Sequence, residues 1–235
     1  MKFTHLTIGI LSFFLSANIA QAQLMGLSFY KISSNSQENI ENQLGAQVRD
    51  QSLALTDFNE SIEANEVLFT FTNSVEVNSN IGEIYFDDGT IFSQTRIINS
   101  LGGFTNYTTC GNKGVKPGNL PDGGTINPVF DATAHFGADT QGNVNNGVNT
   151  SNDIVGIVIE LQTGLDFNHL QQSLIDGTLR LGLHVRSIGS AGFSDSFVNN
   201  AFAPTATPLP AAMWLFGPAL LALTSVIRRK PQKPA

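Results

Sequence analysis

The chain has 235 residues, of which 13% are charged, and a formal net charge of −7. All 19 acidic residues lie between residues 23 and 207, with only seven of the 12 basic residues, so this body carries a net charge of −12. Nucleic-acid affinity depends on Lys and Arg that neutralise phosphates, so the acidic body argues against nucleic acid as a partner. Cys110 is the only cysteine, which excludes an intramolecular disulfide.

Residues 1–22 have the features of a secretory signal peptide. Lys2 precedes an apolar stretch from Leu6 to Leu15, and Ala20-Gln21-Ala22 supplies the small residues that a signal peptidase accommodates. We expect cleavage after Ala22 and export of the remaining chain. The alternative is an N-terminal transmembrane helix, for which the apolar run is short.

The body, residues 23–202, shows the patterns of β-strands. Val67–Thr72 alternates between apolar residues and threonine, which predicts a half-buried strand. Ile154–Ile159 is a continuous apolar run rich in β-branched residues, which predicts a central strand covered on both faces. Leu179–Ile188 alternates again and places His184 on its polar face. Further strands are predicted at residues 24–33, 48–58, 81–86, 91–98, 130–136 and 193–198.

Turns, loops and one helix separate these strands. Asp87-Asp88-Gly89 favours a tight hairpin whose returning strand is 91–98. Residues 102–127 and 137–153 are expected to be long loops at the ends of the domain. The apolar spacing after Gly164 predicts a short helix that ends at Gly177. This order of elements predicts an all-β protein, an antiparallel β-sandwich with one short helix.

The C-terminal segment has three parts in a fixed order. Residues 203–210 form a spacer that contains prolines, and residues 211–227 are an apolar run, predicted to be a transmembrane helix. The final segment, 228–235, is basic and begins with Arg228, Arg229 and Lys230. These three residues are expected to stay in the cytoplasm, which leaves the body outside.

The junction of these parts carries the sequence Pro208-Leu209-Pro210-Ala211, directly after Thr207. Followed by an apolar helix and a basic end, it resembles the VPLPA-CTERM variant of the PEP-CTERM sorting signals of Gram-negative bacteria. The resemblance covers about the last tenth of the chain. This sequence departs from the pattern at Thr207, where the family has Val, and at Pro218 within the helix.

The resemblance implies a route of export. A protein of this kind is secreted, held in the inner membrane as an intermediate facing the periplasm, and cleaved near the motif by an exosortase. It then reaches the cell surface or the extracellular matrix, commonly in organisms that make exopolysaccharide. The alternative is a plain single-span anchor. The strands of residues 179–199 also resemble the last strands of small sandwich domains found ahead of such tails.

Candidate catalytic residues are present, but their spacing matches no catalytic motif. A nucleophile needs a base within hydrogen-bond reach and a third group that orients the base. Neither a Gly-x-Ser-x-Gly elbow nor a His-Glu-x-x-His helix occurs. We therefore expect no enzymatic activity and no catalytic residue. The candidates for the nucleophile, the base and the orienting group are His135, His169, His184, Asp131, Asp166, Asp195, Ser194 and Cys110.

A calcium site is a weaker candidate, because the loop 137–153 is rich in side-chain oxygens. Asp139, Asn143, Asn145 and Asp153 could act as ligands, with Asn149 and Asn152 nearby. The order of an EF-hand is absent, so we expect no cofactor, with calcium as the alternative.

Three functions follow from these observations. The first is an exported surface or matrix protein with a structural or binding role, whose partners are signal peptidase, an exosortase, the inner membrane and possible exopolysaccharide or other matrix molecules. The second is a calcium-assisted carbohydrate-binding or adhesion module. The third, least favoured, is a surface hydrolase.

Overall fold

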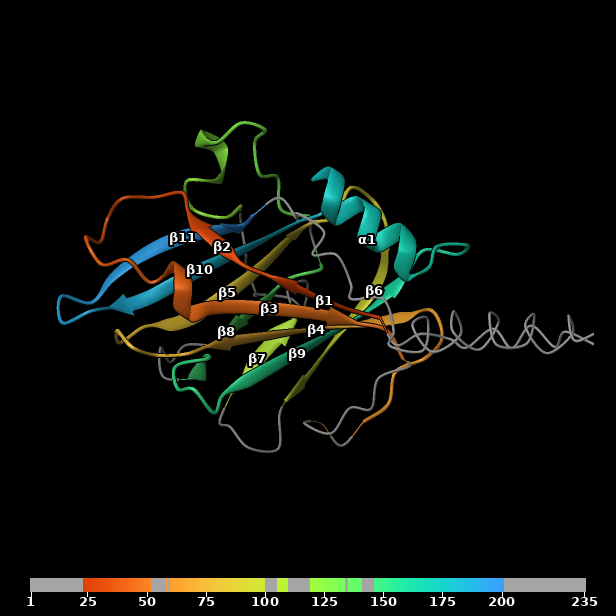
Figure 1. Cartoon of the computed structure of the whole chain (residues 1–235), viewed down its shortest axis with the longest axis horizontal. Coiled ribbons are helices and arrows are strands. Elements are labelled where there is room, and N and C mark those ends of the chain that lie inside the picture. Colours follow the sequence, from red (N-terminus) through yellow and green to blue (C-terminus); the bar gives the residue numbers. More distant parts are fainter. Residues whose placement is uncertain are drawn as a thin grey trace, which may run out of the picture. The chain divides into compact units, whose positions relative to one another are not determined.

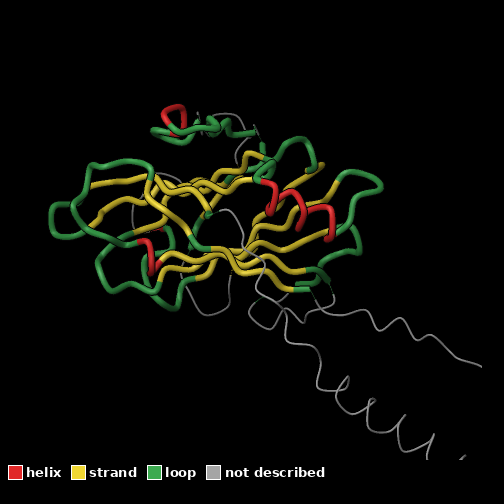
Figure 2. The backbone as a smooth tube through the Cα atoms, turned by 45° about the horizontal axis from the view of Figure 1, so that its top comes forward, coloured by secondary structure: helices red, strands yellow, loops and turns green. Residues whose placement is uncertain are grey.

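The computed structural model describes residues 23–51, 58, 60–99, 105–109, 119–133, 135–140 and 146–200. In this part of the chain the strands form two antiparallel sheets that pack face to face, with one short α-helix at one end (Figures 1 and 2). The predicted all-β, sandwich-like architecture is confirmed. No helix among these residues is both long and apolar enough to span a membrane.

Among the described residues, the first sheet has five strands and the second has six. In spatial order the first contains β1 (Leu24–Leu27), β3 (Leu44–Arg49), β4 (Glu66–Asn73), β9 (Ile154–Leu161) and β6 (Phe92–Asn99). The second contains β2 (Phe29–Lys31), β11 (Phe193–Asn199), β10 (Arg180–Ile188), β5 (Asn80–Asp87), β8 (Ala138–Thr140) and β7 (Tyr107–Thr109). Two 3₁₀ turns, η1 (Glu41–Gln43) and η2 (Gly123–Thr125), lie in the connections.

The predicted strand 24–33 is divided between the two sheets. Its first half, β1, pairs with β3, while its second half, β2, pairs with β11. Ser28 lies between the halves, and the alternating residues Met25, Leu27 and Phe29 are all buried in the core. The chain therefore joins both sheets without interrupting its apolar alternation.

The position predicted for a strand at residues 48–58 is wrong. The strand here, β3, begins at Leu44 and ends at Arg49, because Leu44, Ala46 and Val48 are the alternating residues that face the core. Residues 52–57 lie outside the described part of the chain.

The central strands of the first sheet, β4 and β9, are confirmed, and β9 is covered on both faces as predicted. The strand β4 is more buried than predicted, since Thr70 on its outer face is only 5% exposed. A second apolar cluster covers part of that outer face. Its buried members are Phe58, Ile62, Leu68, Ile98 and Val158.

The hairpin predicted at Asp87-Asp88-Gly89 is also wrong. The flanking strands β5 and β6 both exist, but they lie in different sheets, so the turn is an arch between the layers. Both edges of β5 are already paired, with β10 and with β8. The Asp88 carboxylate accepts hydrogen bonds from the backbone N–H groups of Thr90 and Phe92, which directs the chain into the opposite sheet.

The strand predicted at 130–136 does not form among the residues described there. Phe130 instead packs on the outer face of the second sheet, against Tyr85, Leu120 and Val198. The predicted loop 137–153 contains a short strand, β8, and the predicted loop 102–127 contains β7 and η2. The strands β8 and β7 extend the second sheet beyond β5 (Figure 1).

The segment from β9 to β11 folds as predicted. The helix α1 (Phe167–Asp176) is followed by Gly177, whose φ of 72° is the left-handed conformation that favours glycine. After it, β10 and β11 form the predicted antiparallel pair. The core between the sheets includes edge-to-face aromatic contacts, with ring centroids of Phe69 and Phe86 5.1 Å apart.

Candidate functional site

A row of polar residues crosses the outer face of the second sheet. The register places His184 of β10 opposite Glu83 of β5, and Glu83 opposite Asp139 of β8. On the other side of His184, the register partner is Ser196 of β11. We call Glu83, Asp139, His184 and Arg186 the ionic row.

Glu83 is the centre of this row. Its Oε2 atom accepts a hydrogen bond from the Tyr85 hydroxyl at 2.6 Å and lies 2.7 Å from Nδ1 of His184. Its Oε1 atom forms an ion pair with the Arg186 guanidinium. Burial raises the pKa of Glu83, but the hydrogen bonds from His184 and Tyr85 and the charges of His184 and Arg186 outweigh burial and leave this pKa below its ordinary value.

Asp139 is in the opposite electrostatic situation. Its Oδ1 atom is buried, and no hydrogen-bond partner of that atom is present among the described residues. Burial raises the pKa of Asp139, and the negative charge of neighbouring Glu83 raises it further. Two carboxyl groups on adjacent strands therefore have pKa values that are shifted in opposite directions.

The backbone of β5 makes room for this arrangement. The pairing between β5 and β10 shifts register at Gly82, so Ile81 faces the core while Glu83 faces outward. The Arg186 side chain lies over Gly82, where an added Cβ would be 3.1 Å from its Cδ and Nε atoms. Because Gly82 has no side chain, the Arg186 side chain can lie over the bulge in β5 and reach Glu83.

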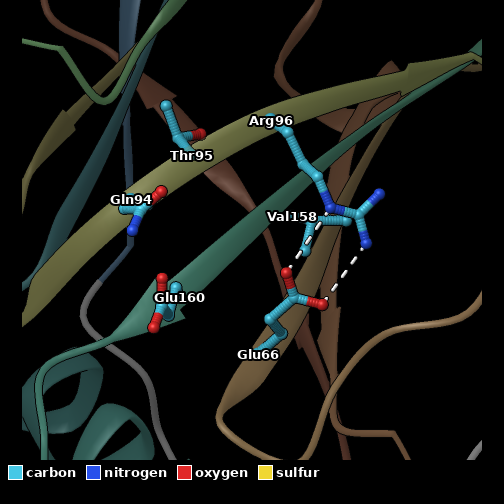
Figure 3. Close-up of a pocket in the computed structure, with 6 residues that line it drawn as sticks. All are labelled: Glu66, Gln94, Thr95, Arg96, Val158 and Glu160. Atoms are coloured by element: carbon cyan, nitrogen blue, oxygen red, sulfur yellow. Dashed lines mark hydrogen bonds and ion pairs between the residues drawn. The ribbon is translucent and has the colours of Figure 1, made fainter.

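The first sheet has its own polar feature, a shallow pocket on the outer face (Figure 3). It is lined by Glu66, Gln94, Thr95, Arg96, Val158 and Glu160. The Arg96 Nε atom donates to Glu66 Oε1 at 3.4 Å, and Nη2 lies 3.3 Å from Glu66 Oε2. The guanidinium also forms an ion pair with Glu60. Burial lowers the pKa of Arg96, but its contacts with Glu66 and Glu60 outweigh burial and raise it.

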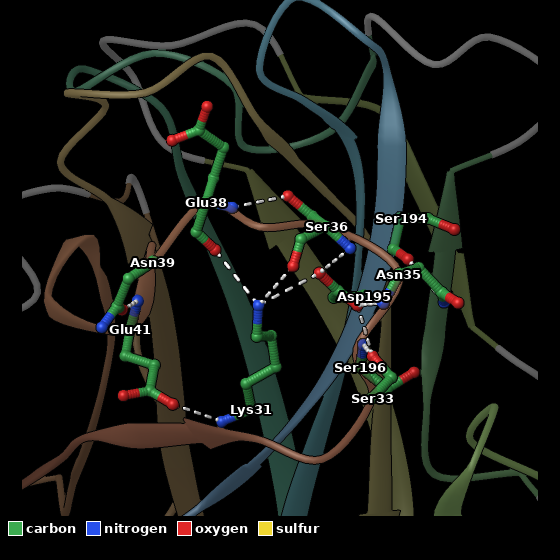
Figure 4. Close-up of polar contacts among 10 residues, drawn as sticks. All are labelled: Lys31, Ser33, Asn35, Ser36, Glu38, Asn39, Glu41, Ser194, Asp195 and Ser196. Atoms are coloured by element: carbon green, nitrogen blue, oxygen red, sulfur yellow. Dashed lines mark hydrogen bonds and ion pairs between the residues drawn. The ribbon is translucent and has the colours of Figure 1, made fainter.

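A third polar cluster surrounds Asp195 and anchors a loop (Figure 4). The Asp195 carboxylate accepts hydrogen bonds from the Ser33 hydroxyl and from the backbone N–H groups of Asn35 and Ser36, at 2.7 to 3.1 Å. The Lys31 ammonium lies 3.6 Å from Oδ2 and donates to the backbone carbonyls of Ser36 and Glu38. Both carboxylate oxygens of Asp195 are used inside the protein, so this cluster holds the connection after β2.

The structure does not bring the catalytic candidates that it describes into one site. His135 is exposed in a connection, with φ of 79°, and Asp131 is exposed near Asp87. Asp166 and His169 form the capping box of α1, and contacts with His169 lower the pKa of Asp166. Among the remaining candidates, His184 belongs to the ionic row, and Asp195 is the centre of the third polar cluster, with Ser194 next to it in the chain. Cys110 lies outside the described residues.

The structure describes only some of the candidate calcium ligands. Asp139 belongs to the ionic row, while Asp153 Oδ2 accepts hydrogen bonds from the backbone N–H groups of Asn149 and Thr150. Asn152 is exposed, and Asn143 and Asn145 lie outside the described residues. In the described part of the chain, no group of three or more His, Cys, Asp or Glu side chains could hold a metal ion.

The targeting segments also lie outside the described residues: the leader 1–22, the sorting motif Pro208 to Ala211, the apolar run and the basic end. Sequence reasoning did not identify Glu83, Arg186, Glu66, Arg96 or Glu160. Only the alternation of β10 offered a signal, because it places Arg186 on the same face as His184.

No protein-family model, curated protein or solved structure matches this chain. The sequence motifs and the geometry of the polar clusters are therefore the basis for a function.

Proposed function

We propose that this chain is an exported protein of the cell surface or extracellular matrix, sorted by an exosortase-type C-terminal signal, with a structural or binding role for its sandwich. The observation that carries this proposal is the order of Pro208-Leu209-Pro210-Ala211, the apolar run 211–227 and the basic residues from Arg228. The leader 1–22 supports it independently, because such a tail acts only on an exported chain.

The route follows from these segments. Signal peptidase removes the leader after Ala22, and the apolar run holds the intermediate in the inner membrane. The run spans about 25 Å as a helix, which is short for a hydrocarbon core of about 30 Å and suits a temporary anchor. An exosortase then cleaves near the motif and releases the acidic sandwich from its membrane segment.

Two features of the sandwich favour a structural or binding role over a catalytic one. Its aspartates mainly fix the backbone: Asp88, Asp153, Asp166 and Asp195 each accept hydrogen bonds from main-chain N–H groups. The three candidate histidines lie on separate elements, and within the described ranges only His184 meets a carboxylate outside a helix cap. This body holds itself together by burial and backbone hydrogen bonds.

The motif can be tested in the native host. A variant with Pro208→Ala and Pro210→Ala is expected to accumulate at full length in the inner membrane. The matched control, Pro204→Ala in the spacer, is expected to be processed and sorted as the wild-type chain is. Equal processing of the motif variant, or equal processing in cells without an exosortase, would refute the sorting proposal.

A surface hydrolase remains a second candidate because of one contact. His184 Nδ1 is held by Glu83 at 2.7 Å, and Ser196 is the register partner of His184 on β11, which places the three residue types of a catalytic triad in one row. Ser196 is only 1% exposed, which gives substrate little access to its hydroxyl. Covalent labelling of Ser196 by a fluorophosphonate, lost in His184→Ala, would support this candidate, and an unlabelled serine would reject it.

A further inference from the structure

The pocket on the first sheet contains two carboxylates whose negative charges are only partly compensated. Glu66 and Glu160 are register partners on β4 and β9, a pairing that is unfavourable for like charges. Arg96 forms ion pairs with Glu66 and Glu60, while Glu160 receives one hydrogen bond, from Asn65 Nδ2 to Oε1 at 2.9 Å. The second oxygen of Glu160 keeps its capacity to accept hydrogen bonds.

Gln94 lies beside this carboxylate. It is the register partner of Glu160 on β6, and Figure 3 shows both side chains on one side of the pocket, with Arg96 and Glu66 on the other. The Gln94 side chain is exposed, and among the described residues its amide has no hydrogen-bond partner. An amide both donates and accepts, and a carboxylate only accepts, so together they match a ligand that carries hydroxyl groups.

The charge of the pocket restricts the class of ligand further. The carboxylates of Glu66 and Glu160 and the one guanidinium of Arg96 line the pocket, and Arg96 is also paired with Glu60, so the pocket is net negative and disfavours anionic ligands. Val158 also lines the pocket, but it is only 1% exposed, so the polar side chains are the groups that a ligand meets. The ion pairs of Arg96 hold the opposite wall in place before any ligand arrives.

We propose that this pocket binds a neutral saccharide, with Glu160 accepting hydrogen bonds from vicinal hydroxyls and Gln94 both donating to and accepting from them. The binding goes beyond the sorting proposal, because it depends on the outer face of β9 and β6 and on none of the tail. It needs no metal, since both groups act directly on hydroxyls.

The test is a binding measurement with the full chain and a panel of neutral tetrasaccharides built from glucose, galactose and mannose. At least one is expected to bind and to shift the NMR signals of Gln94 and Glu160. Glu160→Gln, which keeps the size and the contact with Asn65, is expected to weaken binding about tenfold. Gln94→Ala is expected to weaken it similarly, because Gln94 is exposed and its loss leaves the fold intact.

The matched control is Glu76→Gln, which removes one carboxylate from an exposed loop position and is expected to leave binding unchanged. A chelator is expected to have no effect. The proposal is overturned if no saccharide of the panel binds, or if both pocket variants bind as tightly as the wild-type chain. Loss of binding with chelator, or binding of only a cationic probe such as oligolysine, would overturn it as well. Because none of these measurements involves the tail, failure here leaves the sorting proposal standing.

Discussion

Glu83 and His184 are register partners on β5 and β10, and the Glu83 Oε2 atom lies 2.7 Å from His184 Nδ1. An ionised carboxylate can only accept, so the ring nitrogen that faces it carries the proton. Tyr85 and Arg186 bind the same carboxylate, and Asp139 faces it from β8. The ionic row is thus a small network whose centre is a carboxylate with a lowered pKa.

Glu83→Gln should lower the free energy of unfolding near neutral pH. The pKa of Glu83 is lower in the folded chain than its ordinary value of 4.5, so its stabilising contribution is present above that pH and is lost as the pH falls below it. We expect a loss of about 2 kcal/mol at neutral pH, from hydrogen bonds to a charged group. Urea unfolding at several pH values should show the gap between variant and wild type closing as the pH falls below 4.5. A gap independent of pH would contradict the network.

Asp139→Asn should have the opposite effect. The pKa of Asp139 is raised above its ordinary value of 3.8, so its ionisation begins to oppose folding as the pH rises above 3.8, and the cost is complete above the raised pKa. We expect the variant to be more stable at neutral pH by about 0.5 kcal/mol, the scale of like charges on opposed strands. The same unfolding series checks this, and the gain should vanish as the pH falls towards 3.8.

A calcium-binding alternative makes the reverse prediction for Asp139. If a cation were bound there, the carboxylate would be stabilising and Asp139→Asn would lower the melting temperature. Repeating the series with millimolar calcium and with chelator separates the two cases. A melting temperature that rises with calcium in the wild type, and not in the variant, would contradict the interpretation of Asp139 as a carboxylate that opposes folding.

Asp195→Ala should destabilise the chain more than any change in the ionic row. The Asp195 side chain is fully buried, and its removal leaves the donors of Ser33, Asn35 and Ser36 without this acceptor and Lys31 without its ion-pair partner. We expect a loss of about 3–5 kcal/mol, as for a broken buried ion pair. Hydrogen exchange at residues 33–36 should accelerate most. The control Ser194→Ala keeps the backbone carbonyl that Asn35 uses and should cost less than about 0.5 kcal/mol.

The elements that could be predicted are those whose signals are local. The helix α1 has its cap at Asp166, its apolar spacing and its glycine stop within a dozen residues. The strands β10 and β11 are joined by a short turn, and their alternation determines which residues face the core. In each case neighbouring residues contain all the information that the structure uses.

The parts that could not be predicted depend on distant partners. The turn at Asp88-Gly89 looks like a hairpin locally, but both edges of β5 are taken by β8 and β10, which lie far away in sequence. The ionic row is similar, because Glu83, Asp139 and His184 meet only through strand register. A single sequence shows which residues alternate, and it does not show which strands become neighbours.

The central claim is that the chain is exported and that its C-terminal segment is a cleavable sorting signal. Mass spectrometry of the mature protein, isolated from its native host, tests this most directly. We predict a chain that begins at Gln23 and ends near Pro208-Leu209-Pro210-Ala211, without the apolar run and the basic end. A mature chain that still ends at Ala235 would contradict the claim.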